Sequence, residues 1–319
     1  MYRYLKSVLV TVLTVAGVAA SFASPVRAQE EISVGVLQYV EHESLNQTYE
    51  GFKAGLEEAG YIDGQNLKIN FLNAAGDNAN LQSMSETLRA NDYLFAIATP
   101  AAQGLSNIVK DKPIYFSAVT DPVASGLVTS LEQPGANVTG TIDAGPVEKQ
   151  IELLQSIAPE AKKIGLIYNS GETNSQVEAE KAMAIMKEKG LDPVEATVTS
   201  TNDVSQVIGS VANQVDALFT VTDNTIASAM TLVGDIAIDA GIPLIGGSKD
   251  MALENGLATY GLDYYELGKQ TAQMLVRQIN ENLETKDIPV ETAAKLELVV
   301  NKTVAEKLGI DPNSIQAPE

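Results

Sequence analysis

The sequence contains no cysteine and no tryptophan, and His42 is its only histidine. The lack of cysteine excludes disulfides, thiolate nucleophiles and cysteine metal sites, and a single histidine excludes a histidine cluster. We therefore expect no metal centre, no cofactor, and neither Cys–His nor paired-histidine catalysis. His42 stands between Glu41 and Glu43, a setting that favours a solvated side chain over a catalytic one.

Basic residues are also scarce. Lys and Arg number 21 against 41 Asp and Glu, so the formal net charge is −20. A chain with this charge repels phosphate backbones and anionic lipid surfaces, and nucleic acid is excluded as a partner. Because carboxylates are so frequent, adjacent pairs such as Glu57 and Glu58 are interpreted as solvated helix faces and not as acid–base groups.

Familiar enzyme motifs are missing as well. The sequence has no G-x-G-x-x-G after its first predicted strand, no P-loop G-x-x-x-x-G-K-[ST], no nucleophile elbow G-x-S-x-G and no H-E-x-x-H. The run Gly246-Gly247-Ser248-Lys249 is interpreted as a loop with a flexible turn. We therefore expect no catalytic residue and predict that the chain is not an enzyme.

The amino terminus differs from the rest of the chain. Arg3 and Lys6 precede an apolar run from Val8 to Phe22, and residues 1–28 contain no acidic residue. This pattern is typical of an export signal, with cleavage expected before Gln29. An uncleaved anchor is the alternative, although the run is shorter than the roughly 20 residues that span a bilayer. Either interpretation predicts an exported protein, periplasmic or associated with the cell surface.

One unit recurs through the remaining sequence: an apolar run, a short polar loop and an amphipathic helix. A length of 319 residues suits two domains. The repeated βαβ order predicts an α/β protein with two doubly wound parallel sheets. Strands are expected at 32–37, 67–71, 93–98, 114–119, 164–168, 193–198, 217–221, 243–246, 257–261 and 296–300, with 137–140 as a short crossing segment. Helices are expected at 45–59, 81–90, 146–157, 175–189, 204–212, 226–240, 264–279 and 303–308.

Polar loops follow the predicted strands, and open α/β sheets bind ligands at the carboxyl ends of their strands. Three helix entries there are rich in small and polar residues: 99–103, 171–175 and 222–225. Free backbone N–H groups and the helix dipole suit such entries to a carboxylate. Ordinary N-capping explains any one of them, whereas three on one rim favour a binding cleft.

A ligand ammonium would need an acidic partner. Asp121, Asp223 and Asp263 lie at or just past strand ends, where a carboxylate could pair with it. Asp263 is the preferred candidate, with a simple helix cap before Tyr264 as the alternative. Hydrogen bonds and flat apolar walls are expected from Gln38, Tyr39, Tyr168 and Tyr264.

Four stretches resemble the exported substrate-binding proteins of ABC transporters with the type I periplasmic-binding-protein fold, in particular the tryptophan-binding, TrpX-like branch. They are Val34-Gly35-Val36-Leu37-Gln38-Tyr39-Val40 and the segments 97–103, 134–140 and 222–228. The resemblance implies two lobes that are joined by a three-strand hinge, close on a ligand and are presented to a membrane permease. The expected lobes are 29–141 plus 263–292 and 142–262 plus 293–319.

The resemblance also implies an amino acid ligand between the lobes, with L-tryptophan expected, and a monomeric protein. Its expected contacts are Gln38, Tyr39, Thr99, Pro100, Ala101, Ala102, Asp121, Tyr168, Asn174, Ser175, Asp223, Asn224 and Thr225, with Asp263 on the ammonium. Three alternatives stay open: a ligand sensor for a receptor kinase, a binding protein for another small solute such as a branched-chain amino acid, and an exported enzyme.

Overall fold

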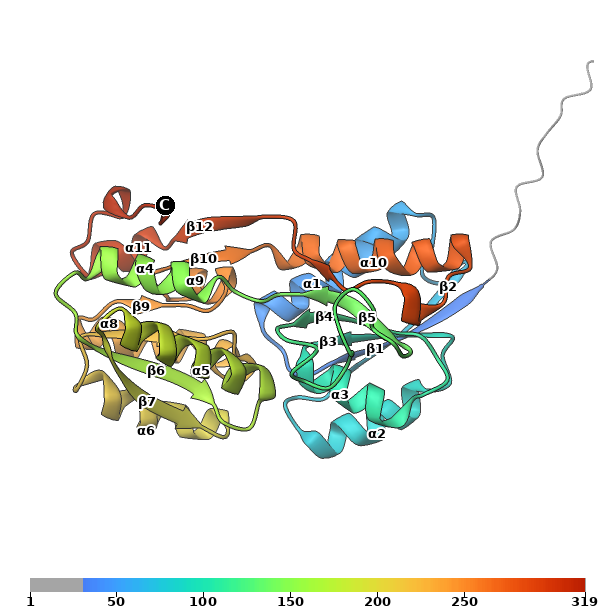
Figure 1. The fold of residues 1–319 in the computed structure, drawn as a ribbon, viewed down its shortest axis with the longest axis horizontal. Coiled ribbons are helices and arrows are strands. Elements are labelled where there is room, and N and C mark those ends of the chain that lie inside the picture. Colours follow the sequence, from blue (N-terminus) through green and yellow to red (C-terminus); the bar gives the residue numbers. More distant parts are fainter. Residues whose placement is uncertain (1–30, 319) are drawn as a thin grey trace, which may run out of the picture. The chain divides into compact units, whose positions relative to one another are not determined.

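Figure 1 shows the computed structural model, which describes residues 31–318. These residues belong to one compact unit. The predicted export signal, residues 1–28, lies outside the described residues. Within 31–318, no helix combines the length and the apolar character needed to cross a membrane.

Two six-stranded sheets organise this unit, one in each lobe. The order is β11-β5-β4-β3-β1-β2 in the first sheet and β12-β10-β9-β8-β6-β7 in the second. Every pairing is parallel except that of β12 with β10. Two doubly wound lobes are thus confirmed. The strands are β1 (Ile32–Gln38), β2 (Leu67–Asn73), β3 (Tyr93–Ile97), β4 (Ile114–Val119), β5 (Val138–Ile142), β6 (Lys163–Asn169), β7 (Asp192–Val198), β8 (Ala217–Thr220), β9 (Leu244–Ile245), β10 (Ala258–Leu262), β11 (Glu291–Thr292) and β12 (Leu296–Val300).

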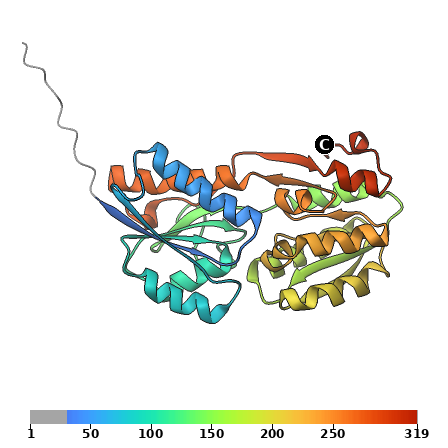
Figure 2. The ribbon, with the colours of Figure 1, turned by 180° about the vertical axis from the view of Figure 1, so that it is seen from behind.

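Helices cover both faces of each sheet (Figures 1 and 2). In the first lobe α1 and α10 lie on one face and α2 and α3 on the other; in the second lobe α4 and α5 lie opposite α6 and α8. The helices are α1 (Glu43–Glu58), α2 (Asn78–Leu88), α3 (Thr99–Ile108), α4 (Val147–Ile157), α5 (Thr173–Glu188), α6 (Thr201–Ala212), α7 (Asn224–Ser228), α8 (Met230–Ala240), α9 (Lys249–Leu253), α10 (Tyr264–Glu281) and α11 (Lys302–Lys307), with 3-10 turns at Thr285–Asp287 and Pro312–Ser314.

The central strands are apolar on both faces because helices cover both faces. In β6, Leu166 packs into the core under α4 and α5, while the next residue, Ile167, packs into the core under α6 and α8. In the first lobe Phe52 of α1 stacks on Phe95 of β3 with ring centroids 3.8 Å apart. Uninterrupted apolar runs in the sequence therefore correspond to strands buried on both sides.

Helix α10 joins the first lobe although it follows β10 of the second. It packs against α1 through glycines: a Cβ at Gly51 would lie 1.9 Å from the Tyr265 carbonyl oxygen, and one at Gly268 would lie 2.0 Å from that of Thr48. The chain thus passes between sheets three times, after β5, after β10 and between β11 and β12. The cleft-facing ends of the strands lie beside these crossings.

The structure differs from the sequence prediction at several places, and one of them is β11, which was not predicted. The segment 137–140, predicted as a short crossing segment, lies largely within β5, which pairs with β4 at Gly140, where a Cβ would lie 2.0 Å from the Phe116 carbonyl oxygen. The predicted helix 226–240 is broken at Ala229, whose φ of −114° and ψ of 14° separate α7 from α8. The predicted loop 246–249 leads into α9, which Ser248 caps by accepting from Met251 N.

Candidate functional site

The order of strands reverses beside β1 in the first sheet and beside β6 in the second, and such switch points are where open α/β sheets bind ligands. Several hydrogen bonds join these ends across the lobes, and two of them are short enough to be firm contacts. His42 Nε2 lies 3.2 Å from Asn224 Oδ1, and the Ser44 hydroxyl donates to Asp250 Oδ2 at 2.7 Å. The carboxyl ends of the two sheets therefore face one another.

A pair of buried carboxylates stands on the second-lobe side. Glu172 precedes α5 and is 2 % exposed; Asp223 precedes α7 and is also 2 % exposed. Asn224 Nδ2 donates to Glu172 Oε2 at 2.5 Å, and the Thr225 hydroxyl donates to Glu172 Oε1 at 2.8 Å. Asp223 accepts from the backbone N–H groups of the strand end and of its own helix. We call Glu172 and Asp223 the carboxylate pair.

The carboxylate pair lacks a basic partner. Burial raises the pKa of Asp223 to about 7, and the negative charge of Glu172 adds to this rise. No positive charge offsets this rise in pKa, because neither acid forms an ion pair with a Lys or Arg among the described residues. A cation arriving beside the pair would relieve this cost. The second-lobe side of the cleft is thus suited to a positive group.

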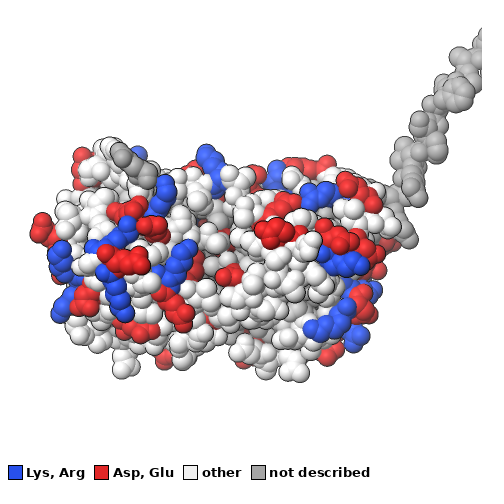
Figure 3. Space-filling view, in the orientation of Figure 1, with Lys and Arg blue, Asp and Glu red and all other residues white. Residues whose placement is uncertain are grey.

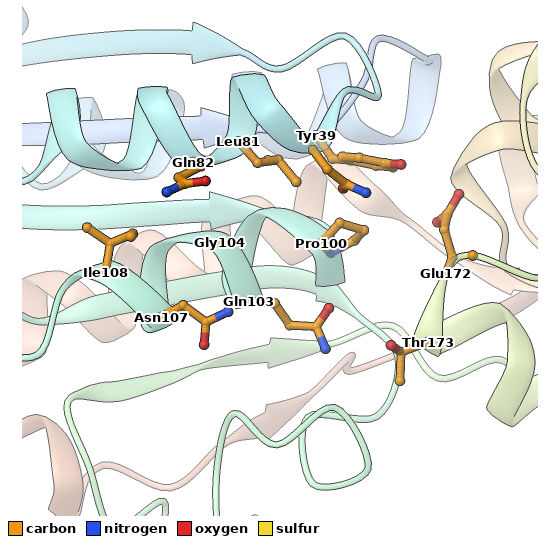
Figure 4. A pocket seen from close by; sticks show the side chains of 12 residues that line it. Tyr39, Leu81, Gln82, Pro100, Gln103, Gly104, Asn107, Ile108, Glu172 and Thr173 are labelled. Atoms are coloured by element: carbon orange, nitrogen blue, oxygen red, sulfur yellow. The ribbon is translucent and has the colours of Figure 1, made fainter.

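Tyr39 is a first-lobe residue that lies near the carboxylate pair of the second lobe. It follows β1, and its pKa is raised by burial and then by the charges of Glu172 and Asp223, so its ring lies within their field. In Figure 4 the side chains of Tyr39 and Glu172 extend toward each other from opposite sides of the cavity. The ring of Tyr39 therefore provides a wall that both lobes share.

The entry of α3, residues 98–102, favours a negative group, in contrast to the carboxylate pair. Ala98 stands before the helix with φ 83° and ψ 155°, a conformation that L-residues rarely adopt, and no side chain caps the helix. Pro100 occupies an early position, where its missing N–H costs nothing. The first N–H groups of an uncapped helix and its dipole attract an anion. The first-lobe side of the cleft is thus suited to a carboxylate.

Four buried polar atoms at these strand ends have no hydrogen-bond partner among the described residues: Gln38 Oε1, Thr99 Oγ1, Asn174 Oδ1 and Thr222 Oγ1. Two come from each lobe. Buried polar atoms are almost always paired, so a cluster of unpaired ones calls for a specific cause. Hydrogen bonds to a bound ligand would supply it.

The largest opening at this place is a cavity of about 470 Å³ between α2, α3 and the loop before α5. Figure 4 shows Leu81 and Gln82 of α2 above Pro100 and Gln103 of α3, with Glu172 and Thr173 at its end. Cavities that hold small molecules are commonly this large. Its walls combine the Tyr39 ring, Leu81 and Pro100 with amide side chains.

Further buried acids lie on the hinge side of the cleft. The Tyr264 hydroxyl donates to Asp143 Oδ2 at 2.8 Å, and the Thr222 backbone N–H donates to Glu178 Oε2 at 2.8 Å. Burial raises the pKa of both acids, that of Glu178 to about 7. No group of three or more His, Asp or Glu side chains within 31–318 is arranged to hold a metal ion.

Most residues predicted for the site meet at these strand ends. Gln38, Tyr39 and Thr99 stand at the ends of β1 and β3, and Ser175 hydrogen-bonds Asp223. The residues brought together are Gln38, Tyr39, Thr99, Pro100, Ala101, Ala102, Asn174, Ser175, Asp223, Asn224 and Thr225.

Three predicted residues lie elsewhere. Asp121 accepts from Val123 N and Ala124 N and so shapes its own turn. The Tyr168 hydroxyl donates to Glu195 on β7. Asp263 caps α10 through Glu266 N and forms an ion pair of 2.9 Å with Lys249, at the hinge. Asp263 thus caps α10, which is the alternative role considered from the sequence.

Two residues that the structure brings to the cleft were not nominated from the sequence. Glu172 lies inside the quoted helix entry 171–175, and the signal for it was an acid among small polar residues at a strand end. His42 was predicted to be solvated, but it is half-buried against Asn224, and burial lowers its pKa to about 4. The two flanking residues, Glu41 and Glu43, are exposed and suggested that His42 is exposed too, although its side chain turns inward.

Comparison with known proteins finds one matching family and several similar proteins. Residues 33–315 match the family model described as ABC transporter substrate binding protein. A tyrosine-binding protein from Clostridioides difficile (strain R20291) is 38 % identical over 283 residues, which are 88 % of this chain and 82 % of that protein.

Two solved structures are similar at nearly equal identity. An ABC domain in complex with L-Trp from Streptococcus pneumonia has a TM-score of 0.84 at 38 % identity and covers 88 % of this chain and 95 % of its own. The ligand-free, open structure of a substrate-binding protein with adhesive properties from Clostridium difficile has a TM-score of 0.67 at 39 % identity, with the same coverage. The present structure is therefore nearer to the ligand-bound relative than to the open one.

Proposed function

The chain belongs to the family of ABC transporter substrate-binding proteins, and from this membership we propose that it binds a free aromatic amino acid, L-tryptophan or L-tyrosine, between its lobes. Two relatives support the choice of ligand: the tyrosine-binding protein and the ABC domain that holds L-Trp. The same observations favour transport over a role as an enzyme.

One observation carries the proposal: the two sides of the cleft have opposite chemistry. The uncapped α3 entry suits a carboxylate, and the carboxylate pair suits an ammonium. A zwitterionic amino acid presents both groups on one carbon. Its hydrogen bonds would also satisfy Thr99 Oγ1 and Asn174 Oδ1, which are buried and unpaired.

The side chain of the ligand would enter the cavity of about 470 Å³. Tyr39, Leu81 and Pro100 provide apolar surface there, and flat rings pack well against aromatic and proline faces. Gln103 and Asn107 provide amides for a polar ring substituent such as an indole N–H or a phenol hydroxyl. An aliphatic side chain would leave much of this surface unfilled.

We further propose that the protein works outside the cytoplasm as a monomer and presents its closed form to a membrane permease. Family membership supports an extracytoplasmic role, and the predicted export signal agrees with it. His42–Asn224 and Ser44–Asp250 would hold the closed form, since each contact links one lobe to the other.

The experiment is thermal unfolding of the purified protein against a panel of the common amino acids, with L-tryptophan and L-tyrosine included. A ligand at about 100 times its dissociation constant stabilises the folded state by about 2.7 kcal/mol. We expect the unfolding temperature to rise selectively with the aromatic amino acids. A rise with aliphatic amino acids alone would contradict the proposed ligand.

A further inference from the structure

The cleft is unbalanced in charge. Five acidic side chains at or behind it are nearly inaccessible, with exposed fractions of 2 to 5 %. They come from both the hinge and the second lobe, and they are Asp143, Glu172, Glu178, Asp223 and Asp250. Glu172 lines one cavity at the cleft, and Asp143 and Asp223 line another; no Lys or Arg within 31–318 lines either cavity. Figure 3 shows Lys and Arg on the outer surface of both lobes instead.

The basic residue nearest to this group is already engaged. Lys249 Nζ lies 2.9 Å from Asp263 Oδ2 and 3.0 Å from Glu297 Oε1, on the hinge side of α9. His42 is the remaining basic group at the cleft, and its burial against Asn224 keeps it neutral. A ligand carboxylate would therefore meet no cationic side chain.

Neutral donors alone are left for that carboxylate. The α3 entry offers backbone N–H groups and the Thr99 hydroxyl, which is 1 % exposed and has no partner. Opposite it, the carboxylate pair repels an anion while it attracts a cation. The ammonium thus gains an ionic contact, whereas the carboxylate gains hydrogen bonds that are offset by repulsion.

From this imbalance we infer that the cleft also binds aromatic amines that lack a carboxylate, because Glu172 and Asp223 give the ammonium an ionic contact, whereas the α3 entry offers the carboxylate no cationic side chain. This inference rests on the proposed function and names a second class of ligand for the same site. Unpaired Asn174 Oδ1 is a buried acceptor that an ammonium N–H of either ligand class could satisfy.

The test compares matched ligands by calorimetry on the purified protein: L-tryptophan, tryptamine, which lacks the carboxylate, and indolepropionic acid, which lacks the ammonium. The corresponding trio is L-tyrosine, tyramine and hydroxyphenylpropionic acid. Loss of the carboxylate removes hydrogen bonds from neutral donors and should weaken binding less than loss of the ammonium does. Loss of the ammonium should weaken it by at least about 30-fold.

A Thr99→Val variant gives a second readout because it removes only a donor at the carboxylate end. The variant should bind L-tryptophan severalfold more weakly than the unmodified protein does. Its affinity for tryptamine should stay within about twofold of that of the unmodified protein. Glu172→Gln should lower the affinity for both ligands. Equal losses for the two ligands in Thr99→Val would overturn the assignment of the two ends.

The outcomes separate this inference from the proposed function. If the amino acids bind while the amines bind no better than the acids, the inference is wrong and the proposed function stands. If the amines bind and the amino acids do not, the proposed ligand is wrong and the inference stands. Absence of binding in both trios would overturn both.

Discussion

His42 of the first lobe and Asn224 of the second lobe meet across the cleft, with 3.2 Å between His42 Nε2 and Asn224 Oδ1. Burial lowers the pKa of His42 to about 4, so the closed arrangement requires a neutral imidazole. Asn224 in turn donates to Glu172. The contact therefore connects the first lobe with the residues proposed to hold the ligand.

Replacing His42 by Ala should weaken ligand binding by about three- to tenfold, the scale of one neutral hydrogen bond between the lobes. Titration calorimetry with L-tryptophan measures this change. Glu41→Gln is the matched control, because Glu41 is exposed and its replacement leaves the contact intact. Equal affinity of the His42→Ala variant and the unmodified protein would show that the contact does not hold the closed form.

The same contact predicts a dependence on pH. The pKa of His42 is lowered in the closed form and rises toward its ordinary 6.5 once the imidazole is exposed, so the stabilisation of the closed form is present above about pH 6.5 and is lost as pH falls toward 4. Between pH 7 and pH 5 this group should reduce affinity by up to roughly 20-fold. In His42→Ala this part of the pH dependence should be absent.

Glu172 is predicted to be the main partner of the ammonium. Glu172→Gln should cost about 2 to 5 kcal/mol of binding free energy, the scale for removing one member of a buried charged pair. Glu195→Gln is the control, since Glu195 belongs to the same lobe but contacts Tyr168 outside the cleft. Unchanged affinity in Glu172→Gln, with a normal circular dichroism spectrum, would contradict the assigned role.

Ligand-free stability should fall as pH rises. Burial raises the pKa of Asp223 and of Glu178 to about 7, above their ordinary 3.8 and 4.5. The stabilisation from each neutral form is complete at low pH and is lost as pH rises through about 7, at most roughly 3 kcal/mol per group between pH 5 and pH 8. Urea unfolding at these two pH values measures it. A more stable protein at pH 8 would contradict the prediction.

The contact between α1 and α10 depends on glycine. Gly51→Ala would place a methyl group 1.9 Å from the Tyr265 carbonyl oxygen and force the helices apart, at a cost of about 2 kcal/mol or more in the free energy of unfolding. Gly209→Ala is the control: Gly209 lies within α6 with no atom near its missing Cβ, so alanine should stabilise the protein by about 0.5 to 1 kcal/mol. Equal effects would refute the packing argument.

The sequence predicts the fold well because buried parallel strands leave a clear apolar signal. Strands such as β1 and β6 appear as uninterrupted apolar runs ended by polar loops, and the two series of strands were placed within one or two residues. β5 was missed as a strand because Val138-Thr139-Gly140 is short and contains glycine. Its pairing depends on the close approach of Gly140 to Phe116, which no local pattern reveals.

Side-chain direction at the cleft could not be predicted in the same way. Asp121, Asp223 and Asp263 occupy similar places after strands, yet only Asp223 turns toward the cleft. The difference lies in partners far apart in sequence: Lys249 draws Asp263 to the hinge, whereas Asn169 and Ser175 hold Asp223 in place. Such partners appear only when the chain is folded.

The central claim is that the carboxylate pair and the α3 entry together bind a zwitterionic aromatic amino acid. Titration calorimetry of ligand-free protein with L-tryptophan and L-tyrosine tests it most directly. The account predicts one-to-one binding of at least one of them, lost or strongly weakened in Glu172→Gln but retained in Glu195→Gln. The claim would be contradicted if neither ligand gave a heat of binding, or if the two variants bound the ligand equally well.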